Sequence, residues 1–154
     1  MRNLITLLAV FFLLGIFAIQ AVAQDGMVTV NSQYSVEETV DRLENTLTNN
    51  GLNIFKKVDH RDGAASVDMQ LQPTTVVIFG NPKLGTPLMQ CAPTVAIDLP
   101  QKMLIWKDGN GNVSIGYNSP EYLKKRHNIT GCDQELQKVN AALQKFAEAA
   151  AGIT

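Results

Sequence analysis

The chain has little charge of either sign, and its composition offers no basic surface. Charged residues make up 18% of the sequence, and 13 lysines and arginines against 14 aspartates and glutamates give a net charge of −1. Proteins that bind nucleic acid through its phosphates gather a surplus of positive charge on one face. The balance here excludes that class, and no nucleic-acid partner is expected.

The sequence also lacks the short motifs of the best-known catalytic and metal-binding classes. It contains no HExxH or CxxC spacing for zinc, no GxSxG turn for a serine nucleophile and no CxxCH for haem. Glycine-rich nucleotide motifs are missing as well, because neither GxGxxG nor the Gly-Lys-Ser/Thr ending of a Walker loop occurs. The sequence therefore predicts no metal site and no cofactor.

The first 23 residues have the pattern of an export signal. Arg2 provides the positive start, an uncharged apolar run extends over residues 4–19, and residues 21–23 have small side chains at the cleavage positions. An uncleaved anchor is the alternative, but a run of about sixteen residues is shorter than the roughly twenty that span a bilayer. We expect residues 1–23 to be removed, which leaves 24–154 as one periplasmic or secreted domain without a stable membrane anchor.

Cysteine is scarce, and both cysteines follow the signal. Cys91 and Cys132 form an even pair in a chain that would be exported to an oxidising compartment, which favours one disulfide between them. Such a bond would close a loop of about forty residues and stabilise the fold by roughly 4 kcal/mol through chain entropy. The alternative is two independent thiols, one of them reactive.

Hydrophobic periodicity predicts an α+β domain in which helices pack mainly on one face of a five-stranded sheet of uncertain strand order. Strands are predicted at residues 27–34, 52–60, 74–80, 102–108 and 112–118. Helices are predicted after N-caps at Ser35, Asp62, Thr86 and Ser119, and a long final helix is predicted over Asp133 to Ala150.

Three of these segments carry specific signals. Ser35 and Glu38 make a capping box, and Gly51 is placed to end that helix in a left-handed conformation. Residues 108–111, Asp-Gly-Asn-Gly, predict a hairpin turn between the last two strands. The run at 74–80 is the most β-like in the chain and predicts a central strand buried on both faces.

The direction of one strand pair decides whether two polar regions can meet. About a dozen residues join the strand ending near His60 to the strand beginning at Thr74. That length is close to the lower limit for a parallel crossover and longer than a plain hairpin needs. If the strands are parallel, His60 and Asn81 leave the same end of the sheet; if they are antiparallel, they leave opposite ends.

The stretch Gly80 to Pro87 combines turn residues with one cation. Thr86 and Pro87 predict a helix start, and the free amides of a helix start beside Lys83 would suit an anion or a carboxylate. The alternative is that these residues only connect a strand to a helix, with Lys83 in water.

Two histidines offer acid–base chemistry near neutral pH. His60 follows a predicted strand and is a candidate general acid or base. His127 ends the basic turn Lys124 to His127, which most simply predicts a solvated helix end that offsets the helix dipole.

The segments QPTTVVIFGNPKLGTPLMQ, APTVAIDLPQKMLIWKD and VSIGYNSPEYLKKRH, with VDHRDGAA upstream, resemble the bacterial family known as domain of unknown function 302. The resemblance runs from about Asn31 to Asn128 and implies an α+β fold, a homodimer and no settled activity. Cys91, Cys132 and the connection NITGCDQE depart from the family pattern, which puts a shared cysteine nucleophile in doubt. The residues that match the pattern are His60, Phe79, Gly80, Asn81, Pro82, Lys83, Gly85, Thr86, Pro87, Asp98, Pro100, Tyr117, Pro120 and His127.

These observations predict a domain that binds a small ligand of anionic character. The predicted ligand-binding residues are His60, Gly80, Asn81, Lys83, Gly85 and Thr86. One alternative is an enzyme that uses His60 as general acid or base. The other is a structural or partner-binding module of the cell envelope.

Overall fold

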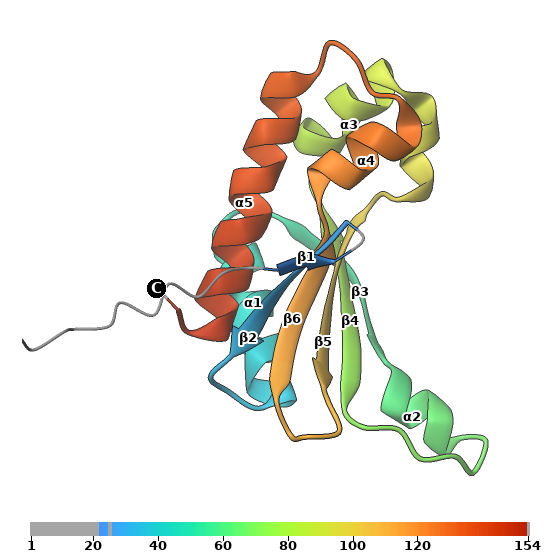
Figure 1. The fold of residues 1–154 in the computed structure, drawn as a ribbon, viewed down its shortest axis with the longest axis vertical. Helices are drawn as coiled ribbons and strands as arrows, with labels where there is room; N and C mark the ends of the chain where they lie inside the picture. Colours follow the sequence, from blue (N-terminus) through green and yellow to red (C-terminus); the bar gives the residue numbers. More distant parts are fainter. Residues whose placement is uncertain (1–21, 25, 154) are drawn as a thin grey trace, which may run out of the picture.

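The computed structural model describes residues 22–24 and 26–153, in which helices cover one face of an antiparallel sheet and extend beyond its ends (Figure 1). The elements are β1 (Val22–Gln24), β2 (Met27–Ser32), α1 (Val36–Asn49), β3 (Asn53–Asp59), α2 (His60–Ala65), β4 (Thr74–Gly80), α3 (Pro82–Cys91), the 3₁₀ helix η1 (Pro93–Ile97), β5 (Gln101–Lys107), β6 (Val113–Asn118), α4 (Pro120–His127) and α5 (Asp133–Ala151).

The sheet has the strand order β1-β2-β6-β5-β4-β3, and every neighbouring pair is antiparallel. The α+β class, the helices on one face and the long C-terminal helix are confirmed. The five predicted strands are β2 to β6, and β1 adds a sixth where the sequence predicted the end of the export signal. Residues 1–21 of that predicted signal lie outside the described residues.

The core lies between the sheet and the helices α1 and α5, which Figure 1 shows side by side on one face. Each of these helices has one apolar stripe, and both stripes are buried over Val77, Met103 and Ile115 of the central strands. Burial of these stripes supplies the hydrophobic stabilisation of the fold. The stripe residues are Val36, Val40, Leu43 and Leu47 of α1, and Leu136, Val139, Leu143, Phe146 and Ala150 of α5.

The predicted local signals at α1 and at the hairpin are confirmed. The Ser35 hydroxyl accepts a hydrogen bond from the Glu38 amide at 3.1 Å, and Gly51 follows the helix with a φ of +72°. In the β5–β6 turn, the Asp108 carboxylate accepts from the amides of Asn110 and Asn112 at 2.9 and 2.8 Å. These contacts depend only on residues close in sequence, and the sequence therefore predicts them well.

The prediction that residues 74–80 are buried on both faces is wrong. Thr75, Val77 and Phe79 point to the helices and are buried, whereas Val76 and Ile78 are only half-buried. Helices cover one face of the sheet, so alternate side chains of β4 remain partly open to solvent. The continuous run of β-branched residues therefore predicts the strand correctly, but it does not show that both faces of the strand are buried.

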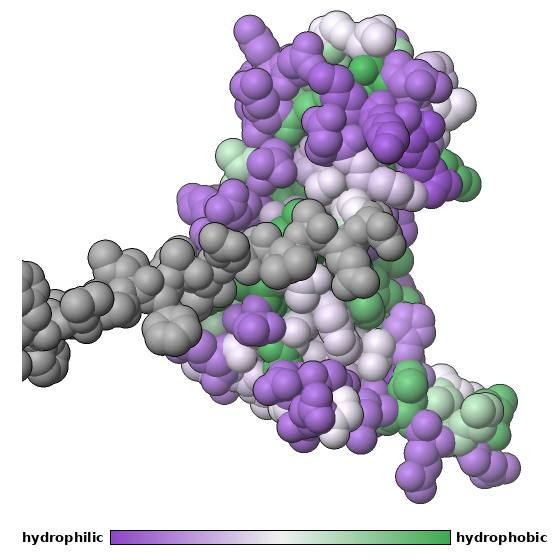
Figure 2. All heavy atoms as spheres, viewed as in Figure 1, coloured by the Kyte–Doolittle hydropathy of each residue, from purple (hydrophilic) through white to green (hydrophobic). Residues whose placement is uncertain are grey.

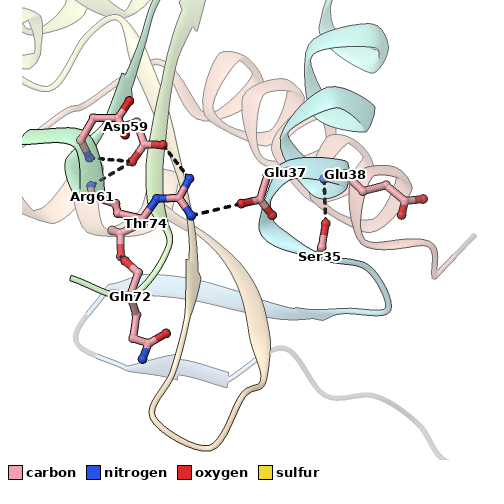
Figure 3. Close-up of polar contacts among 8 residues, drawn as sticks. Ser35, Glu37, Glu38, Asp59, Arg61, Gln72 and Thr74 are labelled. Atoms are coloured by element: carbon pink, nitrogen blue, oxygen red, sulfur yellow. Dashed lines mark hydrogen bonds and ion pairs between the residues drawn. The ribbon is translucent and has the colours of Figure 1, made fainter. Parts of the chain in front are cut away.

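The second predicted helix begins three residues earlier than expected. Asp59, not Asp62, is its N-cap, because the Asp59 carboxylate accepts from the amides of Arg61 and Asp62 at 2.8 and 3.4 Å. Figure 3 shows the Arg61 guanidinium between the carboxylates of Asp59 and Glu37, which links α2 to the start of α1. Met69 lies beyond the helix instead of packing from it.

The segment after α2 is exposed. Met69 is 65% and Leu71 is 45% exposed, and no residue of α2 is buried. Figure 1 shows α2 projecting from the end of β3 and β4, and Figure 2 shows apolar side chains at the surface there. This end of the sheet therefore has no core of its own.

Candidate functional site

His60 lies far from the Gly80 to Pro87 stretch. β3 and β4 pair antiparallel, with Asp59 opposite Thr75 and Asn53 opposite Gly80. His60 follows β3 at one end of the pair, and Asn81 follows β4 at the other end, roughly 20 Å away for six residues of strand. The expectation that these groups share a recess is wrong, because antiparallel neighbours end at opposite ends of a sheet. His60 is exposed, and its side chain makes no hydrogen bond to another described residue.

The helix predicted to begin at Thr86 begins at Pro82. Asn81 is the N-cap and Pro82 the first helical residue, so Thr86 and Pro87 lie inside α3. A capping residue followed by proline favours a helix start at either place. The earlier pair is used, and the later proline is accommodated within the helix.

The amides at this helix start already have acceptors. The Lys83 amide donates to Asn81 Oδ1 at 2.9 Å, and the amides of Leu84 and Gly85 donate to the Asn81 carbonyl at 2.9 and 3.1 Å. An anion at this point would have to compete with these bonds. The Lys83 side chain lies exposed and is not part of the cavity described next.

An apolar cavity of about 270 Å³ lies between α3, the ends of β4 and β5, and α5. Of the predicted ligand residues, Gly80, Asn81, Gly85 and Thr86 line it, whereas His60 and Lys83 do not. The structure therefore gathers most of the predicted stretch at one cavity, whose walls are hydrocarbon. Its lining residues are Leu52, Phe55, Phe79, Gly80, Asn81, Pro82, Leu84, Gly85, Thr86, Leu88, Met89, Ala96, Leu99, Pro100, Gln101, Val139, Ala142, Leu143 and Phe146.

A β-bulge forms part of the cavity mouth. The pairing of β3 with β4 shifts register between Ile54 and Lys56, which leaves Phe55 as the extra residue. Bulges re-aim a side chain out of the regular alternation. Phe55 is 55% exposed and lies 3.4 Å from the position that a Cβ at Gly80 would occupy. With the exposed Leu84, it gives the cavity an apolar rim that is open to solvent.

One residue of the cavity lining has a buried polar atom without a partner among the described residues. Gln101 lines the cavity, and its side-chain nitrogen Nε2 is fully buried and makes no hydrogen bond to them. The side-chain amide of Asn81, by contrast, is used at both ends: Oδ1 accepts from Lys83, and Nδ2 donates to the Gly51 carbonyl at 3.1 Å. A buried donor without an acceptor is costly and calls for an explanation.

The predicted disulfide is confirmed and joins two walls of the cavity. Cys91 is the last residue of α3, and Cys132 is the N-cap residue of α5, with 6.5 Å between their Cα atoms. The bond therefore ties the helix that covers the cavity to the helix that forms its base. A disulfide of this kind is expected in a protein that folds in an oxidising compartment.

A second polar group of residues, Thr94, Asp98, Arg126 and His127, connects η1 to the end of α4. His127 Nε2 lies 2.5 Å from Asp98 Oδ2, and His127 Nδ1 lies 3.1 Å from Thr94 Oγ1. The His127 side chain is 5% exposed and that of Asp98 14%. The prediction of a solvated helix end is therefore wrong for His127, because the imidazole turns inward to η1.

Arg126 completes this group from the solvent side. Its Nε lies 3.3 Å from Asp98 Oδ2, and its Nη1 donates to the Tyr122 hydroxyl at 2.8 Å. The hydrogen bond to Tyr122 and the charge of Asp98 raise the pKa of Arg126. Asp98 is thus paired with a permanent cation.

Sequence reasoning assigned no role to Asp98 or Gln101, and it placed His127 at a solvated helix end. Asp98 and His127 both match the family pattern, but their contact joins residues 29 positions apart. Gln101 carried no signal at all, because a glutamine at the start of a strand is ordinary. Within residues 22–24 and 26–153, no cluster of three or more histidine, cysteine, aspartate or glutamate side chains could hold a metal, and no helix is long and apolar enough to cross a membrane.

Comparison with known proteins identifies relatives that are larger than this chain. Over 109 residues the chain is 42% identical to proteins named fluoride-specific ion channel FluC 1 from Brucella suis biovar 1 and Brucella abortus biovar 1. The match covers 71% of this chain but 43% and 40% of those proteins, so the chain spans about two fifths of the length of these curated relatives.

The fold also occurs in a solved structure. The crystal structure of an uncharacterized conserved protein DUF302 from Bacillus stearothermophilus superposes with a TM-score of 0.74, over 81% of this chain and 98% of that chain, at 19% sequence identity. A family model described as domain of unknown function DUF302 matches residues 28–150. The chain therefore belongs to the DUF302 family.

Proposed function

We propose that this protein binds a small, largely apolar molecule in the cavity beneath α3, and that the molecule presents one hydrogen-bond acceptor to Gln101. The observation that carries the proposal is an apolar cavity whose lining includes Gln101, a residue with a buried side-chain nitrogen that has no hydrogen-bond partner among the described residues. Ligand sites of soluble proteins have this character, with hydrocarbon walls and few polar groups that fix orientation.

The energetics of Gln101 favour a bound acceptor. A buried donor without a partner costs about 1–3 kcal/mol, and a hydrogen bond restores that loss. A ligand carbonyl or carboxyl oxygen would accept the bond, while its hydrocarbon part would lie against Phe79, Met89 and Phe146. The proposed ligand class is thus an alkyl or aryl compound with a carbonyl group.

The size of the cavity sets the size of the ligand. Typical small-molecule sites enclose roughly 300–1,000 Å³, so a cavity of about 270 Å³ lies at the lower end of the range. A compact molecule of about one to three rings, or a short alkyl chain, suits such a space better than a long lipid chain. The open rim at Phe55 and Leu84 provides the entry path.

The names of the Brucella relatives raise fluoride as another ligand for this domain. A small anion needs free N–H donors or cations. In this cavity the walls are apolar, the amides at the start of α3 are bonded to Asn81, and Lys83 lies outside. These features support an apolar ligand over fluoride and over the anion that the sequence suggested.

We further propose that binding takes place outside the cytoplasm. The Cys91–Cys132 disulfide and the export pattern of residues 1–23 together support a periplasmic or secreted protein. The enzymatic alternative that used His60 loses its support, because that side chain is exposed and has no described partner.

A fluorescence assay with N-phenyl-1-naphthylamine, an apolar probe that brightens in hydrocarbon surroundings, tests the proposal. Gly85→Leu places a side chain in the cavity, where a Cβ would lie 3.6 Å from Leu99 Cδ1, and replaces a helical glycine with a better helix former. We expect probe binding by the unmodified protein and loss of binding in Gly85→Leu. Gly63→Leu in α2 is the matched control, since its Cβ meets nothing within 4 Å, and it should bind as the unmodified protein does.

Competition experiments test the role of Gln101. A medium-chain ketone should displace the probe better than the alkane of the same length, and Gln101→Leu should remove this preference while stabilising the fold by about 1 kcal/mol. Equal probe binding in Gly85→Leu and Gly63→Leu would overturn the cavity as a site. An unchanged preference for the ketone in Gln101→Leu would overturn the assigned role of that amide alone.

A further inference from the structure

The group formed by Thr94, Asp98, Arg126 and His127 stands apart from the cavity. None of its four members lines the cavity, although Ala96 of the same 3₁₀ segment does. The group joins a hydroxyl, an imidazole and a carboxylate in one line, with distances of 3.1 and 2.5 Å. These are the distances that define an activated nucleophile: a hydroxyl bonded to a base that a third group orients.

The proton positions in this group follow from its charges. Asp98 pairs with the permanent cation of Arg126, and the carboxylate of such an ion pair can only accept hydrogen bonds. His127 must then donate from Nε2 to Asp98, so a neutral imidazole has its free lone pair on Nδ1. That lone pair faces Thr94 Oγ1, and the threonine hydroxyl donates to it. The tautomer that a general base requires is the one that Asp98 selects.

Solvent exposure in the group increases toward Thr94, the residue that a substrate would have to reach. The His127 and Asp98 side chains are shielded from solvent, whereas Thr94 is exposed at the start of η1. Because a 3₁₀ helix has three residues per turn, Ile97 lies on the same side as Thr94, and it is 73% exposed. The hydroxyl therefore stands at the surface beside an apolar side chain that would contact the hydrocarbon part of an acyl group.

We propose that Thr94 is the nucleophile of an acyl-transfer site, with His127 as its general base and Asp98 as a positioning residue. Thr94 Oγ1 attacks the carbonyl carbon of an ester, and its proton passes to His127 Nδ1. The bond to the leaving alcohol breaks, the alcohol takes that proton, and the acyl group remains on Thr94. Water then attacks the carbonyl carbon of the new ester and loses a proton to His127 Nδ1. The bond from that carbon to Thr94 Oγ1 breaks, Oγ1 takes the proton from His127, and the carboxylic acid leaves.

Acetylation of the full chain, with its disulfide intact, by p-nitrophenyl acetate tests this proposal. We expect a burst of nitrophenolate and one acetyl group on the peptide that contains Thr94, detected by mass spectrometry. Thr94→Val should abolish both, because valine keeps the shape and removes the hydroxyl. Thr94→Ser should retain them. Thr48→Val is the matched control, since Thr48 is an exposed threonine that bonds to the Glu44 carbonyl and has no histidine partner.

Variants at the other positions test the assigned roles. His127→Gln should slow acetylation by about 10²–10⁴-fold. Asp98→Asn should slow it as well, because an asparagine can donate to Nε2 and so favour the tautomer with a proton on Nδ1, whereas Asp98→Glu should restore part of the rate.

Circular dichroism establishes that each variant is folded, and Thr94→Val perturbs only an exposed position. Acetylation of Thr94→Val at the rate of the unmodified protein, or acetyl groups found only on lysines, would overturn the proposal. Either result would leave the group as a structural connection between η1 and α4. The ligand cavity does not contribute to this site, so neither outcome changes the binding proposal.

Discussion

The two ends of the sheet place similar residues in opposite surroundings. At one end, α3, η1, α4 and the start of α5 enclose buried side chains such as Leu88 and Leu123, and a disulfide joins them. At the other end, α2 and the segment after it bury no residue of the helix and expose Met69. Each end has one histidine at a helix terminus: His60 is the first residue of α2, and His127 is the last residue of α4. The His127 side chain is shielded and paired, whereas His60 is exposed.

The comparison shows what turns a polar side chain into part of a site. His127 acquires fixed partners because buried apolar residues of α3, η1 and α4, namely Leu88, Val95 and Leu123, exclude water and hold η1 in place. His60 has no such surroundings, and a side chain in water exchanges its partners freely. Enclosure by secondary structure, more than residue type, separates the two ends.

The largest expected effect comes from opening the disulfide at the enclosed end. Removal of a bond that closes a separation of 41 residues should lower the free energy of unfolding by about 4 kcal/mol. Urea unfolding of the unmodified protein with and without reductant, and of the double variant Cys91→Ala/Cys132→Ala, measures it. Amide hydrogen exchange should become faster in α3 at milder conditions than in α2. If the urea midpoints of the oxidised protein, the reduced protein and the double variant coincide, the disulfide does not stabilise this end.

Matched truncations at the two ends should differ several-fold. Leu88 in α3 is 1% exposed and Leu71 after α2 is 45% exposed. Leu88→Ala leaves an unfilled space in the core and should cost about 3 kcal/mol, whereas Leu71→Ala should cost less than about 0.5 kcal/mol. Thermal and urea unfolding of the pair provide the measurement. Similar losses in the two variants would show that the end near α2 is packed against something in solution.

The dependence of stability on alkaline pH tests, with a smaller expected effect, whether water is excluded from the enclosed end. Burial, with a contribution from the charge of Glu148, raises the pKa of Tyr117 from 10.0 to about 12. The folded state therefore holds this proton more tightly than the unfolded state, so the contribution is fully present below about pH 10 and is lost as the pH rises toward about 12. A shift of this size corresponds to up to about 3 kcal/mol.

Urea unfolding of the unmodified protein and of Tyr117→Phe across the alkaline range isolates this contribution. The difference in unfolding free energy between the two proteins should change by up to about 3 kcal/mol as the pH increases. A constant difference would mean that the Tyr117 hydroxyl is hydrated in the folded state.

Local chemistry made most of the secondary structure predictable. The caps at Ser35 and Ser119 and the turn at Asp108 depend on neighbours within four residues, and each forms as predicted. The amphipathic stripe of α5 is long enough to identify the helix to within one residue of its end. The disulfide followed from the number of cysteines and the inferred compartment.

The predictions that were wrong concern contacts between segments that are distant in the chain. A connection of intermediate length left the direction of β3 relative to β4 open, and the antiparallel outcome separated His60 from Asn81. Two equivalent start signals occur in α3, and local chemistry could not choose Asn81 over Thr86. The burial of His127 requires η1 to pack on α4, and the isolation of Gln101 requires a cavity around it; neither arrangement is encoded near those residues.

The order Gly80-Asn81-Pro82 allows very few replacements. Asn81 uses the two ends of one amide for different tasks, holding the start of α3 with its oxygen and the end of α1, at Gly51, with its nitrogen. Aspartate would keep the first task and lose the second, glutamine would retain both groups but on a longer arm, and serine has no second end to offer. Substitution at this one position would therefore uncouple the end of α1 from the start of α3, which Asn81 joins through Gly51, a residue 30 positions away in the chain.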